Sequence, residues 1–128
     1  MGLKERRIIY RIQTEQLPYR VERLKEISGV DIHYDIDWES MEAAGEELEN
    51  FDYYVLNHIT QAIDWLCSDP VGKQAVQQGI QKIVITHVDD PNQKEITLKN
   101  GVVTYTVALV TGGYFETGAI HNTLEAAL

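Results

Sequence analysis

The 128-residue chain has a single cysteine, Cys67, and no long apolar run. One cysteine excludes an intramolecular disulfide framework and is typical of proteins kept in a reducing compartment. No apolar stretch approaches the roughly 20 residues that a membrane-spanning helix needs. The start of the chain, residues 1–7, is charged and is not followed by the apolar region of a secretory signal. These absences predict a cytoplasmic protein without a membrane span.

The sequence also lacks the short motifs of common enzyme classes. It contains no HExxH motif, no EF-hand loop and no Cys/His zinc spacing. It also lacks the GxGxxG motif and a phosphate-binding loop that ends in Lys-Ser/Thr. Gly112-Gly113 lies between a predicted strand and a predicted helix, but Glu116 follows and would repel an anion. Cys67 is expected at the C-terminal end of a helix, where the helix dipole disfavours a thiolate. We therefore predict no cofactor and no metal, and the sequence does not favour an enzyme.

Positive charge is scarce and unevenly distributed. The chain has 11 Lys/Arg against 20 Asp/Glu, a net charge of −9. Residues 1–30 hold seven Lys/Arg and four Asp/Glu, whereas residues 31–52 hold nine Asp/Glu and no Lys/Arg. A negative field repels nucleic acid and anionic membranes and attracts basic proteins, although an acidic surface can also serve solubility alone.

The strongest local signal is the stretch 80–110, which predicts a three-stranded antiparallel meander. Asn100-Gly101 favours a type I′ turn because both positions need a positive φ. A two-residue turn fixes the register of the strands beside it and places Ile96, Leu98, Val103 and Tyr105 on one face. The predicted strands are 80–88, 94–99 and 102–110.

The remaining elements follow from hydrophobic spacing and from Gly and Pro. Residues 30–38 alternate apolar and polar side chains, which predicts a half-buried strand at one edge of the meander. Residues 4–15 are compatible with a helix or a short strand. The predicted helices are 18–28, 48–67, 70–78 and 116–128. The sequence thus predicts one α+β domain, 1–128, with an antiparallel sheet of about four strands and helices mainly on one face.

The leading functional hypothesis is a protein-binding module of the adaptor, immunity or chaperone type. Its acidic segment, residues 31–52, would face a basic partner and steer association with it. The partner-binding residues predicted within this segment are Asp35, Asp37, Glu39, Glu46 and Glu47.

Two alternatives remain open from the sequence. The first is a metal- or carboxylate-dependent enzyme centred on His33, Asp35 and Asp37, because carboxylates with imidazole suit several divalent metals. The second is a homodimer of unknown role, joined through the sheet or through the surface of Tyr53 and Tyr54. Aromatic side chains such as these can line a pocket or an interface.

Overall fold

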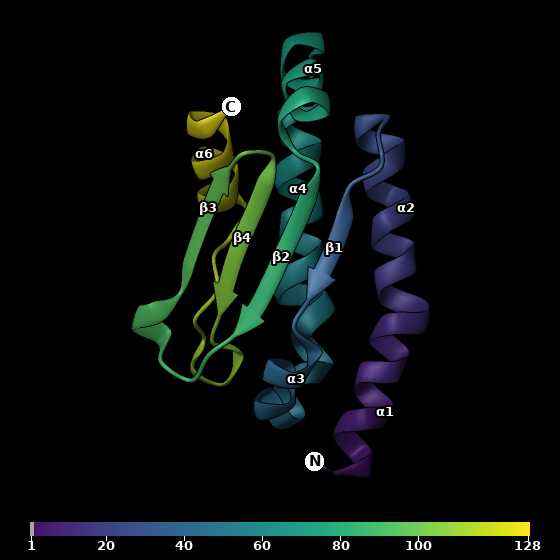
Figure 1. Ribbon diagram of the computed structural model, residues 1–128, viewed down its shortest axis with the longest axis vertical. Helices are drawn as coiled ribbons and strands as arrows, with labels where there is room; N and C mark the ends of the chain where they lie inside the picture. The colour runs from purple at the N-terminus through teal and green to yellow at the C-terminus, as the bar shows by residue number, and fades with distance from the viewer. Residues whose placement is uncertain (1) are drawn as a thin grey trace.

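A computed structural model describes residues 2–128 and is built on a four-stranded mixed sheet (Figure 1). The strands lie in the order β1-β2-β4-β3. β1 pairs with β2 and β2 with β4 in parallel, and β3 pairs with β4 antiparallel. The predicted α+β class and four-stranded sheet are confirmed, but the predicted antiparallel sheet is wrong. The strands are β1 (His33–Ile36), β2 (Lys82–His87), β3 (Glu95–Lys99) and β4 (Val102–Val107).

The β3–β4 hairpin has the register expected from its turn. Lys99 lies opposite Val102, and Ile96 lies opposite Tyr105. Asn100 has φ 53° and Gly101 has φ 79°. Both turn residues thus have the positive φ that a type I′ turn requires, and this part of the meander prediction is confirmed.

The first strand of the predicted meander pairs elsewhere. After β2, residues 88–94 pass the end of β4 and carry the chain to the far edge of the sheet, so that β4 lies between β2 and β3. Within this connection Asp90 caps a 3-10 turn, and that turn lengthens the connection instead of closing a hairpin. β2 gains a hydrogen-bonded neighbour on both edges, which satisfies the backbone groups of a strand whose apolar side chains are buried.

The N-terminal residues form one long helix with a π-helical turn in its middle. Residues 4–15, which the sequence made compatible with a helix or a short strand, are therefore helical, and the π turn ends at Gln16, just before the predicted helix 18–28. Pro18 has no N–H to donate to the carbonyl group of Thr14, and a wider turn accommodates the missing bond. Gly29, with φ 81°, ends the helix. Its parts are α1 (Leu3–Arg11), η1 (Ile12–Gln16) and α2 (Leu17–Ser28).

The chain between β1 and β2 is helical and makes the crossover between these parallel strands. β1 is shorter than the predicted strand 30–38 because Asp37 caps the helix that follows. Asp69 caps α5 by accepting a hydrogen bond from the N–H of Gly72 at 2.6 Å. The crossover elements are α3 (Trp38–Met41), η2 (Glu42–Asn50), η3 (Asp52–Leu56), α4 (Asn57–Leu66) and α5 (Pro70–Gly79); later come η4 (Pro91–Gln93), η5 (Leu109–Thr111) and α6 (Thr117–Ala127).

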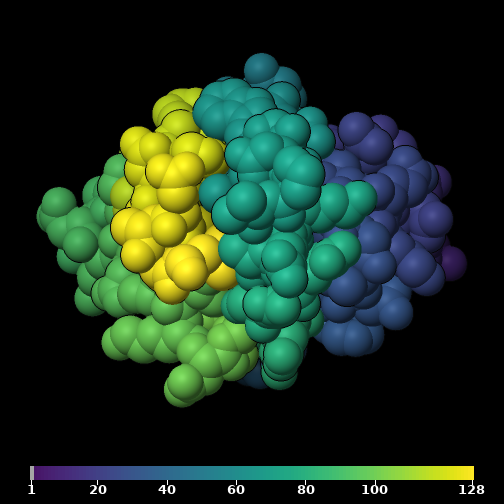
Figure 2. All heavy atoms as spheres, turned by 90° about the horizontal axis from the view of Figure 1, so that it is seen from above, coloured from purple at the N-terminus to yellow at the C-terminus, as the bar shows by residue number. Residues whose placement is uncertain are grey.

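The helices α2, α4 and α6 cover one face of the sheet (Figure 1). Figure 2 shows α6 in yellow beside the teal α4 and α5, with the blue N-terminal part on the other flank. The buried side chains between the layers form one cluster that includes Ile12, Leu24, Ile63, Ile85 and Tyr105. No helix in residues 2–128 is long and apolar enough to span a membrane.

The second face of the sheet carries polar and β-branched side chains. His33, Asp35, Lys82 and Thr104 are exposed there, and Val84 is partly covered. In Figure 1 this face is turned to the viewer, and none of the described helices crosses it. The protein therefore has two layers, the sheet and the helices on one of its faces, and the second face of the sheet is not covered by a described helix.

Candidate functional site

The acidic segment 31–52 is not a single free surface, because the N-terminal helix folds back over part of it. Lys4 Nζ lies 2.8 Å from Glu46 Oε1, and Arg11 forms an ion pair with Glu49. The Lys4 ammonium lowers the pKa of Glu46 by hydrogen bonding to it. Four of the segment's carboxylates, those of Glu46, Glu49, Asp52 and Asp31, have a cationic partner from the N-terminal helix.

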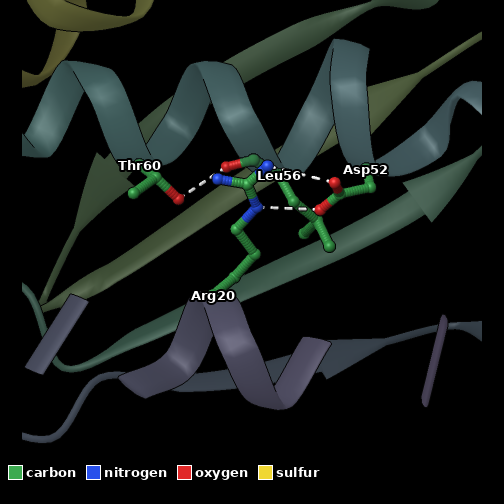
Figure 3. Close-up of polar contacts among 4 residues, drawn as sticks. All are labelled: Arg20, Asp52, Leu56 and Thr60. Atoms are coloured by element: carbon green, nitrogen blue, oxygen red, sulfur yellow. Dashed lines mark hydrogen bonds and ion pairs between the residues drawn. The ribbon is translucent and has the colours of Figure 1, made fainter. Parts of the chain in front are cut away.

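The third of these pairs is the most enclosed. Arg20 of α2 donates from Nε to Asp52 Oδ1 at 2.8 Å and from Nη2 to Asp52 Oδ2 at 3.0 Å (Figure 3). The two side chains are 15% and 21% exposed. This hydrogen bonding raises the pKa of Arg20, so the pair stays charged. Asp52 therefore joins η3 to the N-terminal helix, and its carboxylate is not available to a partner protein.

Asp35 also lies apart from the other predicted partner-binding residues. It projects from β1 onto the open face of the sheet, where its carboxylate lies 3.4 Å from Lys82 Nζ. Of the five predicted residues, the structure thus pairs Asp35 and Glu46 with lysines. Asp37, Glu39 and Glu47 have no Lys or Arg within 4.0 Å in the described chain.

These three carboxylates lie at the end of the sheet where the parallel strands finish. β1, β2 and β4 run in the same direction, so the segments that follow them emerge at one end, below the sheet in Figure 1. Further acidic residues follow β2 and β4 there. We call the acidic residues of these segments the carboxyl-end surface; they are Asp37, Glu39, Glu42, Glu47, Asp89, Asp90 and Glu116.

Some of these carboxylates have a structural role as well. Asp37 Oδ1 accepts from the N–H of Ser40 at 3.1 Å, and the Ser40 hydroxyl accepts from the N–H of His87 at 3.0 Å. The beginning of α3 is thereby tied to the end of β2. Asp90 Oδ1 accepts from the N–H of Asn92 at 2.9 Å. Helix capping explains why Asp37 and Asp90 occur there. The carboxylates of Glu39, Glu42 and Asp89, by contrast, form no hydrogen bond within residues 2–128.

A cluster of aromatic side chains borders the carboxyl-end surface. The rings of Tyr54 and Tyr114 are stacked with their centroids 4.7 Å apart. Tyr53 meets Tyr54 edge-on at 5.1 Å, and the His58 ring lies 6.4 Å from Tyr114. Tyr53 and Tyr54, which the sequence suggested as a possible interface, come together, whereas the exposed Trp65 lies beside His121. The sequence did not identify Tyr114 as a member, because it reaches the cluster only through the path of the chain after β4.

The loop that carries Tyr114 is held from two sides. The hydroxyl of Tyr105, on β4, accepts from the N–H of Phe115 at 2.7 Å. His58 Nδ1 lies 3.3 Å from the carbonyl oxygen of Phe115, and a carbonyl only accepts, so Nδ1 carries the proton. His58 Nε2 is 3.8 Å from the carboxylate of Glu116. The cluster is thus supported by hydrogen bonds to the sheet and to α4.

The structure does not bring His33, Asp35 and Asp37 together into the metal site of the metal-dependent alternative. His33 and Asp35 project from the open face of the sheet, while Asp37 is occupied as the cap of α3. Among residues 2–128, no three His, Cys, Asp or Glu side chains come close enough to hold a metal ion. His87, which the sequence places near Asp89 and Asp90, is buried and accepts from the N–H of Leu109 at 3.2 Å.

Two other features of the molecule resemble functional sites. Cys67 follows α4, and burial raises the pKa of its thiol, which disfavours a nucleophilic thiolate. A hollow of about 420 Å³ lies between α4, α5 and α6, at the opposite end of the molecule from the carboxyl-end surface. Its polar side chains are already engaged, since Asp69 caps α5 and His121 lies 3.4 Å from Glu125.

Comparison of the chain with protein-family models, with characterised proteins and with solved structures found no match.

Proposed function

We propose that this protein is a non-enzymatic binding module that engages a positively charged protein through the carboxyl-end surface. The observation that supports the proposal most directly is the distribution of ion pairs. Asp31, Glu46, Glu49 and Asp52 are paired with the N-terminal helix, and Asp35 is paired with Lys82. The carboxylates of the carboxyl-end surface have no Lys or Arg partner among the described residues.

Such a surface affects association more than it affects the fold. Unpaired carboxylates on one side of a protein raise the rate at which a basic partner arrives, and salt screens the effect over about 10 Å at moderate ionic strength. The residues of the acidic segment that contribute are Asp37, Glu39, Glu42 and Glu47. The proposed interface therefore includes only part of residues 31–52 and adds Asp89, Asp90 and Glu116 from later in the chain.

Charge reversal on the carboxyl-end surface tests this function. Glu39→Lys, Glu42→Lys and Asp89→Lys together should abolish low-salt binding to an immobilised peptide of alternating arginine and glycine. The matched control is Glu15→Lys with Glu22→Lys and Glu26→Lys, which makes the same change of net charge on the exposed side of the N-terminal helix. Surface plasmon resonance at several salt concentrations would measure the two variants against the unmodified chain.

The two variants separate a local surface from bulk charge. The proposal predicts that the carboxyl-end variant loses binding and its salt dependence, while the control keeps most of both. Equal loss in both variants would mean that net charge alone governs binding. Capture of natural partners from a cytosolic extract, eluted with salt, would then identify the basic protein.

A second candidate, self-association, is favoured by the open face of the sheet. Glu95 and Lys99 lie at opposite ends of β3, on the same face as Thr97 and Thr104. A two-fold axis running across the strands would place Lys99 against Glu95 of the partner subunit, over a centre of β-branched side chains. Light scattering tests this reading: a dimer that Thr104→Arg converts to a monomer supports it, and a monomer in the unmodified chain excludes it.

A further inference from the structure

Three tyrosines form an accessible aromatic surface at the rim of the carboxyl-end surface. Tyr53 is 64% exposed, and Tyr54 and Tyr114 are partly exposed. Tyr53 and Tyr54 come from η3 and Tyr114 from the loop before α6, so the group joins two segments far apart in the sequence. Tyrosines with one accessible face are typical of the residues that dominate binding interfaces. We call Tyr53, Tyr54 and Tyr114 the tyrosine cluster.

The charged side chains that act on Tyr114 are negative. Burial and the neighbouring Tyr54 raise the pKa of Tyr114, and Glu116 and Glu47 raise it further. Glu47 has no cationic partner among the described residues, and the Glu116 side chain is 79% exposed. The π faces of tyrosine rings also carry negative charge density. Rings and carboxylates together therefore favour a cation and disfavour an anion.

One cation of the chain already lies over the aromatic ring next to the cluster. Lys94 Nζ lies 4.7 Å from the centroid of Phe115, the residue that follows Tyr114. The tyrosine cluster itself has no Lys or Arg over its rings in residues 2–128, where the recorded cation–π contacts involve Tyr19 and Phe115. A cation is thus accommodated beside the cluster, and the parts of the three rings that are not stacked on each other have no cation of the described chain over them.

The cluster is also held in place before any partner binds. The N–H of Phe115 donates a hydrogen bond to the Tyr105 hydroxyl, and the carbonyl oxygen of Phe115 accepts one from His58 Nδ1. Thr117 Oγ1 donates to Gln61 Oε1 at 2.9 Å, which fixes the start of α6 against α4. Aromatic rings held in this way lose little conformational entropy on binding.

We propose that the tyrosine cluster binds the side chain of an arginine presented by the basic partner. The planar guanidinium group can stack on a tyrosine face while it donates hydrogen bonds to a carboxylate. Glu116 and Glu47 supply that carboxylate. This inference rests on the proposed function, and it assigns the cluster as the anchor point within a wider electrostatic interface.

The test is a nuclear magnetic resonance titration of the full chain with three synthetic peptides. These are the arginine–glycine peptide, its lysine–glycine counterpart and a glutamate–glycine peptide. The ring protons of Tyr54 and Tyr114 should shift most with the arginine peptide, less with the lysine peptide and not with the glutamate peptide. The same titration reports on the backbone amides of Glu39, Asp89 and Asp90, so the two parts of the interface are observed separately.

Two pairs of variants assign the effect to the cluster. Tyr53→Leu should weaken binding of the arginine peptide about tenfold, whereas Tyr10→Leu, at a tyrosine of similar exposure on α1, should not. Glu116→Gln should also weaken it, whereas Glu125→Gln should not. Both glutamates lie near a histidine ring at the two ends of α6 and are well exposed, so the second pair is closely matched. Tyr53 is too exposed for its replacement to unfold the chain.

Each outcome decides the question. Shifts confined to the amides of Glu39, Asp89 and Asp90, with the tyrosine rings unchanged, would overturn this inference and leave the proposed function standing. Absence of peptide binding at low salt would overturn both. Ring shifts that appear on raising the protein concentration without peptide would show that a second copy covers the cluster, and would overturn the assignment to an arginine.

Discussion

Arg20 and Asp52 join the N-terminal helix to the central helical segment through two parallel hydrogen bonds, one of 2.8 Å and one of 3.0 Å. Both side chains are mostly enclosed, and each satisfies the charge of the other. Bonds between charged groups in this forked geometry are stronger than neutral ones. The pair thus stabilises the fold and neutralises one carboxylate of the acidic segment.

We expect Asp52→Asn to lower the free energy of unfolding by about 1–3 kcal/mol, because it leaves the enclosed guanidinium group of Arg20 without an anion. Urea denaturation followed by circular dichroism measures the change. Glu46→Gln is the control, since it breaks the exposed pair with Lys4, and it should change stability little. Similar losses in the two variants would contradict the special role of the Arg20–Asp52 pair.

A second expectation concerns two tyrosines with opposite hydrogen-bonding situations. The hydroxyl of Tyr34 is buried without a hydrogen-bond partner among residues 2–128, and burial raises the pKa of Tyr34. The hydroxyl of Tyr105 accepts from the N–H of Phe115, and burial raises its pKa to about 12. An unpaired buried hydroxyl destabilises a fold, whereas a paired one stabilises it.

Tyr34→Phe should therefore leave the free energy of unfolding unchanged or raise it by about 1 kcal/mol, while Tyr105→Phe should lower it by about 1–2 kcal/mol. Thermal and chemical denaturation of the two variants under the same conditions would show the difference. A loss of stability on Tyr34→Phe as large as that on Tyr105→Phe would mean that the Tyr34 hydroxyl has a partner, such as a bound water molecule.

The sequence predicts the fold where local rules are sufficient. The turn at Asn100-Gly101 fixes the β3–β4 register, and Asp69-Pro70 marks the start of α5, because each signal acts over a few residues. The order of the strands could not be predicted in this way. Alternation in residues 82–87 shows which side chains face the core, but it is the same for a parallel and an antiparallel neighbour.

The same limit applies to the candidate site. The sequence predicted Asp37, Glu39 and Glu47 as partner-binding residues and Tyr53 and Tyr54 as a possible dimer surface, because composition and spacing are visible locally. It grouped Asp35 and Glu46 with these acids, since nothing local shows that lysines from other parts of the chain would reach them. The contribution of Tyr114 and Glu116 depends on where the chain returns after β4, which is a property of the whole topology.

The contact between the end of α4 and the start of α5 supports a third prediction. A Cβ atom added at Gly72 would lie 1.8 Å from the carbonyl oxygen of Leu66, which is far too close for any side chain. Gly72→Ala should therefore destabilise the protein by several kcal/mol or prevent folding, since backbone atoms cannot move aside cheaply. Differential scanning calorimetry measures the change.

Gly118→Ala is the matched control for that prediction. Gly118 is also helical, and no atom lies within 4 Å of a Cβ added there. Alanine has the higher helix propensity, so this variant should gain up to about 1 kcal/mol. Equal effects of the two alanine substitutions would show that helix propensity, and not the close approach of Leu66 to Gly72, determines the result.

The last prediction concerns the pH dependence of stability, through His87. Burial lowers the pKa of His87 from its ordinary value of 6.5, although the carboxylate of Asp89 opposes the shift. The neutral ring is the form seen in the fold, because Nε2 accepts a hydrogen bond from the N–H of Leu109 at 3.2 Å. A protonated Nε2 could not accept that bond.

A histidine whose pKa is lower in the folded than in the unfolded protein takes up its proton more readily when unfolded. The stabilising effect is therefore fully present above pH 6.5, and it declines as the pH falls from 6.5 toward the lowered pKa of the folded protein. His87→Gln keeps an oxygen that can accept from Leu109 and has no titrating group in this range. The free energy of unfolding of the unmodified chain should decrease relative to that of His87→Gln between these two pH values, as measured by urea denaturation at a series of pH values. Parallel curves for the two proteins would contradict the role assigned to His87, and a difference growing above pH 6.5 would reverse its sign.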